Sequence, residues 1–389
     1  MISSRSTFLP FHQPSIGNEE IQEIIATLKS GWITTGPRTK LFEERFREYI
    51  GCQYAIAVNS CTAGLHLALV AAGVGPGDEV ITTPYTFAAT GEVIIQVGAR
   101  PVFVDIEADS LNIDPAAIER AITAKTKAII PVHIAGLPCR MAEIMDIAER
   151  HHLVVIEDAA HAFAAEYRGR KIGNIGHITA FSFYATKNLT TGEGGMVTTN
   201  DPEYAEKMRL LSLHGLSKDA WKRYSAEGSW YYEIVHAGYK YNMSDIQAAL
   251  GLQQLKKIGS FQQIRESYAT KYNVAFQNTA ELILPHQTVD SKHAWHLYIL
   301  RLKLESMHIT RSQFIQELHR RQIGTSVHFI PLHLHPYYKR NFVFDQPLRH
   351  AENAYEQAVS LPLYPAMSER DVEDVVQAIY NILDAHHKG

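Results

Sequence analysis

The stretch FSFYATKNLTTGEGGMVTTND (residues 181–201) predicts two short strands joined by a loop, and this loop holds a lone lysine, Lys187. Three glycines follow the lysine, at Gly192, Gly194 and Gly195. A lysine in such a loop is often a solvated surface residue. Alternatively, a lysine that is desolvated at the end of a buried strand has a lowered pKa and can bond covalently to an aldehyde. The surrounding sequence decides between these two interpretations.

Short apolar runs alternate with amphipathic stretches from about residue 54 to residue 201. The apolar runs are YAIAVN (54–59), EVITTPY (79–85), RPVFVDI (100–106), KAIIPVHI (127–134), LVVIEDA (153–159), ITAFSFY (178–184) and GMVTTN (195–200). Runs rich in β-branched residues that alternate with helical patterns indicate a mostly parallel sheet wrapped by helices. The predicted fold class is therefore α/β.

The pattern changes after about residue 250, where we expect a smaller α+β domain. A long helical pattern (244–277), broken near Gly259, precedes the alternating stretch HAWHLYILRLK (293–303). Two more helical patterns (310–322 and 368–386) flank a loop rich in histidine, proline and tyrosine. The predicted domains are residues 1–250, an N-terminal arm and the large domain, and residues 251–389, the small domain.

Composition argues against several classes of function. The 389 residues carry a formal net charge of −4 and no basic run of the kind that nucleic acid requires. The three cysteines, Cys52, Cys61 and Cys139, form no CxxC motif, which argues against a disulfide framework and a zinc site. No apolar run approaches the ~20 residues that cross a bilayer, and the N-terminus lacks the features of a secretory signal. We therefore expect a cytoplasmic protein that binds neither nucleic acid nor membrane.

Polar residues follow several strands of the predicted sheet, at the edge where ligands bind in doubly wound folds. Cys61 and Thr62 open a helix, where free N–H groups and a hydroxyl can seat a phosphate, or where the polar residues only cap the helix. Asp158 ends another strand, where a carboxylate can be structural or can hold a cationic ring nitrogen. Ser182 lies shortly before Lys187 and can donate a hydrogen bond to a phosphate.

Together these groups match the needs of pyridoxal 5′-phosphate, whose aldehyde bonds to a lysine and whose ring nitrogen pairs with an aspartate. The order along the chain fits, because the phosphate seat comes first and Asp158 precedes Lys187 by about 30 residues. His161 follows Asp158 closely and is either a structural histidine or a further contact. No Walker lysine motif and no GxGxxG fingerprint competes with this hypothesis.

Longer motifs are similar to those of a known family. Besides the opening stretch they are GWITTGPRTKLFEERF (31–46), NSCTAGLHLAL (59–69), TPYTFAAT (83–90), VIEDAAHAFAAEYRGRKIGNIG (155–176), HGL (214–216), GYKYNMSDIQAALGLQQL (238–255) and HFIPLHLHPYY (328–338). From about residue 31 to residue 364 the chain resembles the DegT/DnrJ/EryC1/StrS aminotransferases. The resemblance implies the fold-type I architecture, pyridoxal 5′-phosphate as cofactor and amination of nucleotide-linked keto-sugars.

The resemblance also implies roles for individual residues. Lys187 matches the lysine that holds the cofactor as an imine and moves protons, and Asp158 matches the partner of the ring nitrogen. The other matches are Cys61 and Thr62 (the helix-start phosphate seat), Ser182 (the phosphate-binding serine), Phe87 (the aromatic stacked on the ring), His161 (a contact to the ring face or the phenolic oxygen) and Asn242 (a contact to the phosphate in the neighbouring subunit). Many members have Ser or Ala at the Cys61 position and Gln at the His161 position. The role of Asn242 implies a homodimer with shared active sites.

Two segments resemble those that line the sugar-nucleotide cleft, WITTGP (32–37) and TSVHFIPLHLHPYY (325–338). The predicted substrate contacts there are Thr34, His328 and Tyr338. The second segment is rich in histidine, but it lacks the acidic neighbours that usually support a catalytic zinc site, so we predict no metal. Lys240 and Arg223 either meet the nucleotide diphosphate or belong to the solvated surface.

The predicted function is transamination that depends on pyridoxal phosphate. L-glutamate is the expected amino donor, a UDP- or dTDP-linked 4-keto-6-deoxy-hexose is the expected acceptor, and the amino-sugar product serves surface glycans such as lipopolysaccharide. Some family members carry histidine in place of the lysine and catalyse dehydration, so Lys187 favours aminotransfer. Three alternatives stay open: an aminotransferase for 3-keto-sugars, a non-catalytic regulator of the same fold, and a lyase or desulfurase, which needs a mobile reactive cysteine.

Overall fold

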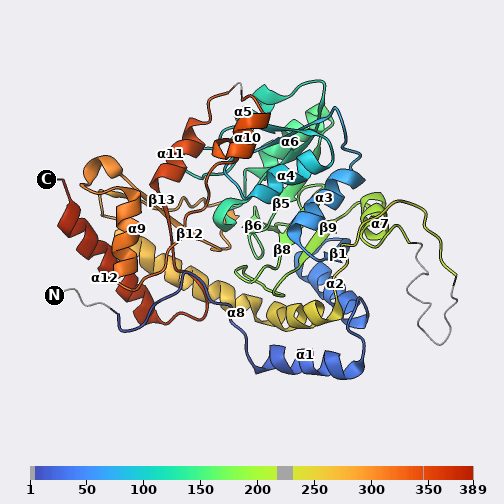
Figure 1. Cartoon of the computed structure of the whole chain (residues 1–389), viewed down its shortest axis with the longest axis horizontal. Helices are drawn as coiled ribbons and strands as arrows, with labels where there is room; N and C mark the ends of the chain where they lie inside the picture. The colour runs from blue at the N-terminus through green and yellow to red at the C-terminus, as the bar shows by residue number, and fades with distance from the viewer. Residues whose placement is uncertain (1–4, 217–230, 345, 389) are drawn as a thin grey trace.

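A central sheet organises the larger part of the molecule (Figure 1). The computed structural model describes residues 5–216, 231–344 and 346–388. Within them, seven strands pair in the order β1-β9-β8-β5-β4-β2-β3. Their bounds are β1 Tyr54–Val58, β2 Glu79–Thr82, β3 Arg100–Phe103, β4 Thr126–Ile130, β5 Val154–Asp158, β8 Ile178–Ser182 and β9 Gly195–Thr199. Strand β9 is antiparallel to β1 and β8, and the other pairs are parallel, which confirms the predicted mostly parallel sheet.

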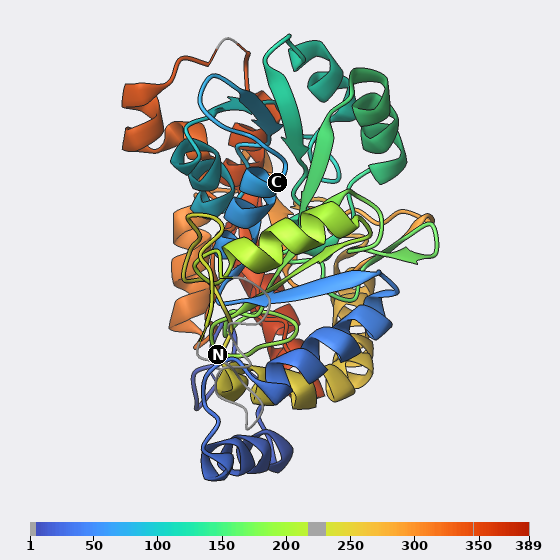
Figure 2. The same ribbon diagram turned by 90° about the vertical axis from the view of Figure 1, so that its right-hand side faces the viewer.

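Helices cover both faces of this sheet (Figures 1 and 2). One face packs against α2 Pro37–Ile50, α5 Pro115–Ala121, α6 Met141–His151 and the first part of α8 Asp245–Phe276. The other face packs against α3 Cys61–Ala71, α4 Ala88–Gln96 and α7 Pro202–Leu211. Because successive side chains of a strand point to opposite faces, Val155 joins the first core and Ile156 the second. By the same alternation, Glu157 and Asp158 at the end of β5 face opposite ways.

The small domain is built around a second, antiparallel sheet. This sheet has the order β10-β12-β13, with β10 Leu282–Ile283, β12 Tyr298–Leu302 and β13 Ala358–Leu361. Helices α9 Arg311–Arg320 and α12 Glu369–His386 pack against it, as the two helical patterns predict. Further elements of the described residues are α10 Pro336–Asn341, α11 Arg349–Gln357, the short strands β6 Glu166–Tyr167, β7 Arg170–Lys171 and β11 Ser291–Lys292, and the 3-10 helices η1 Ile134–Gly136, η3 Leu304–Ser306 and η4 Leu332–Leu334.

The N-terminal arm reaches the small domain before the chain enters the large one. Leu9 is buried in the small-domain core and pairs with Ile323 through a β-bridge. Helix α1 Asn18–Ser30 then lies beside α8, below it in the view of Figure 1. The arm therefore connects both domains along the edge of the molecule that α8 forms.

Helix α8 is continuous from Asp245 to Phe276, so the predicted break near Gly259 is wrong. A glycine inside a helix costs only ~1 kcal/mol relative to alanine, and the burial of both ends of α8 outweighs this cost. The early residues Ala248 and Leu252 belong to the large-domain core, whereas Tyr272 belongs to the small-domain core. The predicted domain division between residues 250 and 251 falls inside this shared helix.

Candidate active site

A pocket of about 510 Å³ is lined by the carboxyl ends of the central strands and by residues of the small domain. It brings together eight of the predicted site residues: Cys61, Thr62, Phe87, Asp158, His161, Ser182, Lys187 and His328. Asp158 and Ser182 end β5 and β8, Cys61, Thr62 and Phe87 follow β1 and β2, Lys187 and His161 follow β8 and β5, and His328 comes from the segment between α9 and α10. The carboxyl ends of parallel strands share one edge of a sheet, which is why segments far apart in the sequence meet here.

The start of α3 forms one wall of the pocket. Ser60 caps this helix, because its Oγ accepts a hydrogen bond from the Ala63 N–H at 3.1 Å. The N–H groups of Cys61 and Thr62 have no acceptor among the described residues, and the helix dipole favours an anion at this end. A Cβ on Gly195 would lie 2.8 Å from the Cys61 nitrogen, so glycine is needed where β9 passes the helix start. The wall thus has the backbone geometry of a phosphate seat.

Asp158 is buried at the end of β5, with few hydrogen bonds for a carboxylate. Its Oδ2 accepts from Thr90 Oγ1 at 2.8 Å, and its Oδ1 accepts from the Ala160 N–H at 3.1 Å. Burial raises the pKa of Asp158, while these hydrogen bonds and the nearby Lys187 act in the opposite direction. A buried carboxylate of this kind is stabilised by a cation beside it, such as a protonated ring nitrogen.

Lys187 lies in the loop between β8 and β9, and its partly exposed side chain lines the pocket. Its backbone N–H donates to the Tyr184 carbonyl at 2.9 Å, which fixes the turn that carries it. Burial lowers the pKa of Lys187 to about 8, although the nearby Asp158 opposes this shift. Near pH 8, about half of the amine is therefore neutral and able to act as a nucleophile.

His161 and His328 reach the pocket from the large and the small domain, and each has a polar partner. The Nδ1 of His161 accepts the Ala135 N–H at 3.2 Å, so the ring proton is on Nε2. The Nδ1 of His328 lies 2.8 Å from Ser360 Oγ. Burial lowers the pKa of His161 well below its ordinary value and lowers the pKa of His328 to about 4. Both rings are therefore neutral at pH 7 and offer hydrogen bonds rather than charge.

Two further histidines of the pocket, His12 and His296, were missed by sequence reasoning. His12 belongs to the N-terminal arm, and burial lowers its pKa to about 3. His296 belongs to the stretch that predicts a strand, but the observed strand β12 begins only at Tyr298. The Nδ1 of His296 lies 3.1 Å from Asn188 Oδ1. Neither has a motif around it; only the folded arm and loop bring them to the site.

Two predicted contacts, Asn242 and Thr34, lie outside the lining of this pocket. They belong to neighbouring segments, because Asn242 Nδ2 donates to Thr35 Oγ1 at 2.6 Å. Thr34 is exposed, and its carbonyl accepts the Asp245 N–H at 3.0 Å. Asn242 also accepts a hydrogen bond from Lys240, whereas Arg223 lies outside the described residues. The roles of Asn242 and Thr34 stay predictions.

Tyr338 is also outside the pocket lining and is buried in an apolar cluster with Phe103, Leu332 and Leu348. Its hydroxyl has no hydrogen-bond partner in the described structure. In the same segment, His333 Nε2 lies 2.9 Å from Glu352 Oε1.

The described residues include no group of three or more histidine, cysteine or acidic side chains placed to hold a metal ion. Among the described helices none is long and apolar enough to cross a membrane.

Comparison with known proteins places the chain in a family. Residues 14–380 match the DegT/DnrJ/EryC1/StrS aminotransferase family. The chain belongs to this aminotransferase family. It is 54% identical over 385 residues to the spore coat polysaccharide biosynthesis protein SpsC of Bacillus subtilis, covering 98% of this chain and 99% of SpsC. It is 59% identical over 380 residues to the uncharacterized protein MJ1066 of Methanocaldococcus jannaschii, covering 97% and 98%.

Solved structures of a putative sugar aminotransferase have the same fold. The putative sugar aminotransferase Spr1654 of Streptococcus pneumoniae, in its PMP form, superposes with a TM-score of 0.91 at 37% identity. The match covers 97% of this chain and 99% of Spr1654, and the PLP form of the same protein gives a TM-score of 0.90. The predicted fold-type I aminotransferase architecture is therefore confirmed. As a member of the DegT/DnrJ/EryC1/StrS family, the protein is an aminotransferase.

Proposed function

We propose that this aminotransferase transfers the amino group of L-glutamate to a nucleotide-linked keto-sugar, for the synthesis of a surface polysaccharide. The observation that carries the proposal is the shared pocket of Lys187 and Asp158, which holds an amine of lowered pKa and a buried carboxylate. The similarity to SpsC, whose name refers to spore coat polysaccharide, supports the polysaccharide pathway. The acceptor that we propose is a UDP- or dTDP-linked 4-keto-6-deoxy-hexose, processed in the cytoplasm.

The cofactor is pyridoxal 5′-phosphate, and the residues of the pocket fit it. The Cys61 and Thr62 N–H groups and Ser182 would hold its phosphate, Asp158 its ring nitrogen and Lys187 its aldehyde. Phe87 is 63% exposed although it lines the pocket, so its ring is free to cover a bound cofactor. When bound, the cofactor supplies an electron sink for the carbanion that forms at the carbon bearing the amino group.

In this proposal Lys187 moves the proton. Once its Nζ is free, the neutral amine would take the proton from the α-carbon of L-glutamate and deliver it to the aldehyde-derived carbon of the cofactor. In the second half of the reaction it would move a proton from that carbon to the sugar carbon that receives the amino group. A pKa of about 8 suits both tasks, because the amine can be either neutral or protonated near neutral pH. Asp158 remains a carboxylate and keeps a proton on the ring nitrogen by charge pairing.

The alternatives differ in what the pocket would have to supply. An aminotransferase for 3-keto-sugars would use the same cofactor residues and differ at the sugar contacts His328, Tyr338 and Thr34. A desulfurase needs a reactive cysteine, whereas Cys52, Cys61 and Cys139 are all buried. Burial raises the pKa of the Cys61 and Cys139 thiols well above the ordinary value, which makes them poor nucleophiles. A non-catalytic regulator has no need of a lysine of lowered pKa.

The decisive experiment has two stages. First, the cofactor-loaded enzyme is mixed with L-glutamate alone, and conversion of the cofactor to its amine form is followed by absorbance. Second, the amine form is mixed with a panel of UDP-, dTDP- and GDP-linked 3-keto- and 4-keto-sugars. A lyase or a regulator does not complete the first stage, and a preference for 3-keto-sugars in the second stage would replace the proposed acceptor.

Replacement of Lys187 tests the assignment of the site. Lys187→Ala should abolish both stages and the visible absorbance of the lysine-bound cofactor, because no other group can take over bonding and proton transfer together. Lys207→Ala, on the exposed surface of α7, is the matched control and should keep the parent rate. A Lys187→Ala protein that transaminates at the parent rate would contradict the assignment.

A further inference from the structure

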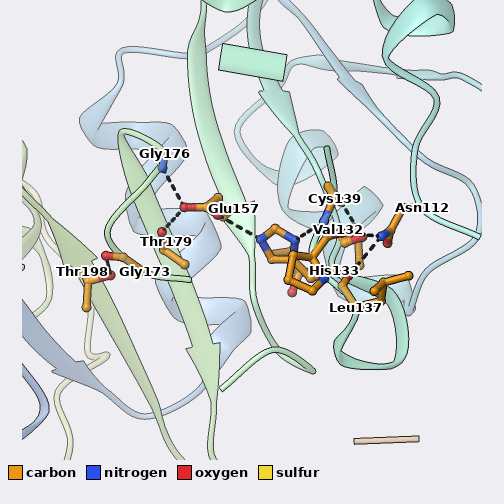
Figure 3. Close-up of polar contacts among 12 residues, drawn as sticks. Asn112, Val132, His133, Leu137, Cys139, Glu157, Gly173, Gly176, Thr179 and Thr198 are labelled. Carbon is orange, nitrogen blue, oxygen red and sulfur yellow. Dashed lines mark hydrogen bonds and ion pairs between the residues drawn. The ribbon is translucent and has the colours of Figure 1, made fainter. Parts of the chain in front are cut away.

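Glu157 faces away from Asp158 at the end of β5, and its side chain belongs to a buried polar network, whose residues are drawn in Figure 3. At its centre, Glu157 Oε1 accepts from the Gly176 N–H at 2.8 Å and from Thr179 Oγ1 at 2.7 Å, and Oε2 lies 2.9 Å from His133 Nε2. The side chains of Glu157 and His133 are both fully buried. Although burial alone raises it, the pKa of Glu157 is lowered overall by His133 and the other hydrogen bonds. Glu157 is therefore a buried carboxylate.

His133 uses both ring nitrogens and its main chain. Its Nδ1 accepts the Cys139 N–H at 3.0 Å and so carries no proton, which leaves Nε2 to donate to Glu157. Its backbone N–H donates to the Asp158 carbonyl at 3.2 Å. His133 thus holds two consecutive residues of β5, Glu157 by its side chain and Asp158 by its main chain.

The loop after β4, residues 132–139, links His133 to two histidines that line the pocket, His161 and His296. Within it, the Ala135 N–H donates to His161 Nδ1, and the Ala135 carbonyl accepts the His296 N–H at 3.0 Å. Ala135 has a φ of 56°, a left-handed conformation that a non-glycine residue keeps only where its surroundings hold it. The position of Ala135 therefore depends on how the loop is anchored.

Asn112 anchors the loop from the side away from β5 (Figure 3). Its Nδ2 donates to the Leu137 and Pro138 carbonyls, both at 3.0 Å, and its Oδ1 accepts the Ile134 N–H at 3.0 Å. The loop is thus held at two places, by His133 on Glu157 and by Asn112. Both anchors are buried and neither lines the pocket.

We propose that His133 is a positioning residue of the cofactor site: by joining Glu157 to the 132–139 loop, its imidazole fixes the orientation of Asp158 and His161. The inference rests on the proposed roles of Asp158 and Lys187 in holding the cofactor. It assigns a function to Glu157, which precedes Asp158 directly but faces away from the pocket. In this role the Glu157 carboxylate accepts the His133 hydrogen bond and so holds the 132–139 loop against β5.

Two substitutions of His133 separate its two hydrogen bonds. A glutamine amide reaches the position of Nε2 and can donate to Glu157, whereas an asparagine oxygen reaches the position of Nδ1 and accepts only the Cys139 N–H. The measurement is the dissociation constant of pyridoxal 5′-phosphate from the full-length protein, by absorbance titration. His133→Asn should weaken binding by about tenfold or more, because a buried carboxylate loses a donor, and His133→Gln should restore most of the affinity.

Thr198→Val is the matched control. Thr198 Oγ1 donates to the Gly173 carbonyl at 2.8 Å, so the substitution also removes one buried hydrogen bond from the large domain without touching the 132–139 loop (Figure 3). It should lower the thermal midpoint and leave the dissociation constant at the parent value. An effect on cofactor affinity as large as that of His133→Asn would mean that general loosening, and not positioning, weakens binding.

Other results of these measurements would contradict the proposed positioning role of His133. The inference is wrong if His133→Asn binds the cofactor as tightly as the parent, or if the Gln and Asn variants lose affinity equally. Should His133→Asn not fold, Asn112→Ala tests the same loop from its other anchor, and unchanged affinity there would overturn the inference. A parent protein that does not bind the cofactor, or a Lys187→Ala protein that keeps the absorbance of the lysine-bound cofactor, contradicts the proposed function instead.

Discussion

At the scale of single residues, burial shifts the pKa values of Lys187 and Asp158 in the directions that their proposed tasks require. Burial disfavours the charged form of each group, so it lowers the pKa of Lys187 to about 8 and raises the pKa of Asp158. The lysine gains the neutral form that bonding to an aldehyde needs. The aspartate gains a preference for a cationic partner, which a protonated ring nitrogen provides.

The same burial makes Lys187 costly to the cofactor-free fold at neutral pH. Below pH 8 the folded protein must hold a partly desolvated ammonium, whereas between pH 8 and the ordinary pKa of 10.5 the folded state releases the proton before the unfolded state does. Stability without cofactor should therefore rise with pH through this window. Lys187→Met should melt at a higher temperature than the parent at pH 7, and the difference should shrink toward pH 10.

Thermal denaturation of the cofactor-free proteins at both pH values checks this expectation. Lys207→Met, on the exposed surface of α7, is the control for adding a methionine and should show no such pH-dependent gain. A Lys187→Met protein whose advantage is absent at pH 7, or equal at both pH values, would show that charge burial is not the cause.

The site residues that could be predicted are those with a position in the strand pattern. Asp158 and Ser182 end strands and Cys61 opens a helix after one, so the sheet edge gathers them as expected. His12 and His296 could not be predicted in this way, because one lies in an arm without periodicity and the other in a loop before a strand. The positions of the proposed cofactor residues therefore follow from secondary structure, whereas the positions of His12 and His296 depend on tertiary packing.

At the scale of elements, Asp245 joins α8 to the start of α2. It is fully buried, and its Oδ1 accepts from the Gly36 N–H and from both the N–H and the Oγ1 of Thr39, at 2.8, 2.9 and 2.7 Å. Its Oδ2 accepts from the Arg38 N–H at 3.0 Å. One carboxylate thus satisfies the free donors at the beginning of α2 and holds the segment that contains the predicted substrate contact Thr34.

Asp245→Ala leaves these buried donors without an acceptor and should destabilise the protein by about 3 kcal/mol or more. Asp146→Ala removes a carboxylate that pairs with Arg150 on the exposed surface of α6, and it should cost well below ~1 kcal/mol. Denaturant titration of the two variants beside the parent measures the difference. Equal losses in the two variants would mean that Asp245 is not the connection that the geometry indicates.

The continuity of helix α8 could not be predicted from local sequence patterns. The seven strands of the central sheet and the helices α9 and α12 follow from local periodicity, and all of them are confirmed. The break at Gly259 was wrong, because propensity disfavours glycine by only ~1 kcal/mol, while packing against two cores acts along the whole helix. A Cβ at Gly259 would meet nothing within 4 Å, so this glycine is a surface residue and not a hinge.

At the scale of the whole molecule, Asn242 lies outside the pocket of its own chain, as we would expect if the homodimer implied by the family resemblance forms. The Asn242 side chain donates a hydrogen bond to Thr35, and Asn242 itself forms an isolated β-bridge with Val58, the last residue of β1. If it contacts the phosphate in the neighbouring subunit, each active site is complete only in the assembly. A symmetric dimer places such a residue in both sites at once.

Subunit mixing tests this arrangement. Lys187→Ala removes the lysine from the site of its own chain, and Asn242→Ala removes the asparagine that would contact the phosphate in the other subunit's site. Each homodimer should therefore be impaired in both sites. A mixed dimer contains one site with neither residue and one site with both, because the intact lysine and the intact asparagine come from different subunits. Unfolding and refolding the two variants together should therefore restore activity above that of either variant refolded alone. If both residues serve the site of their own chain, every site in a mixed dimer carries one defect, and refolding the variants together gives no gain.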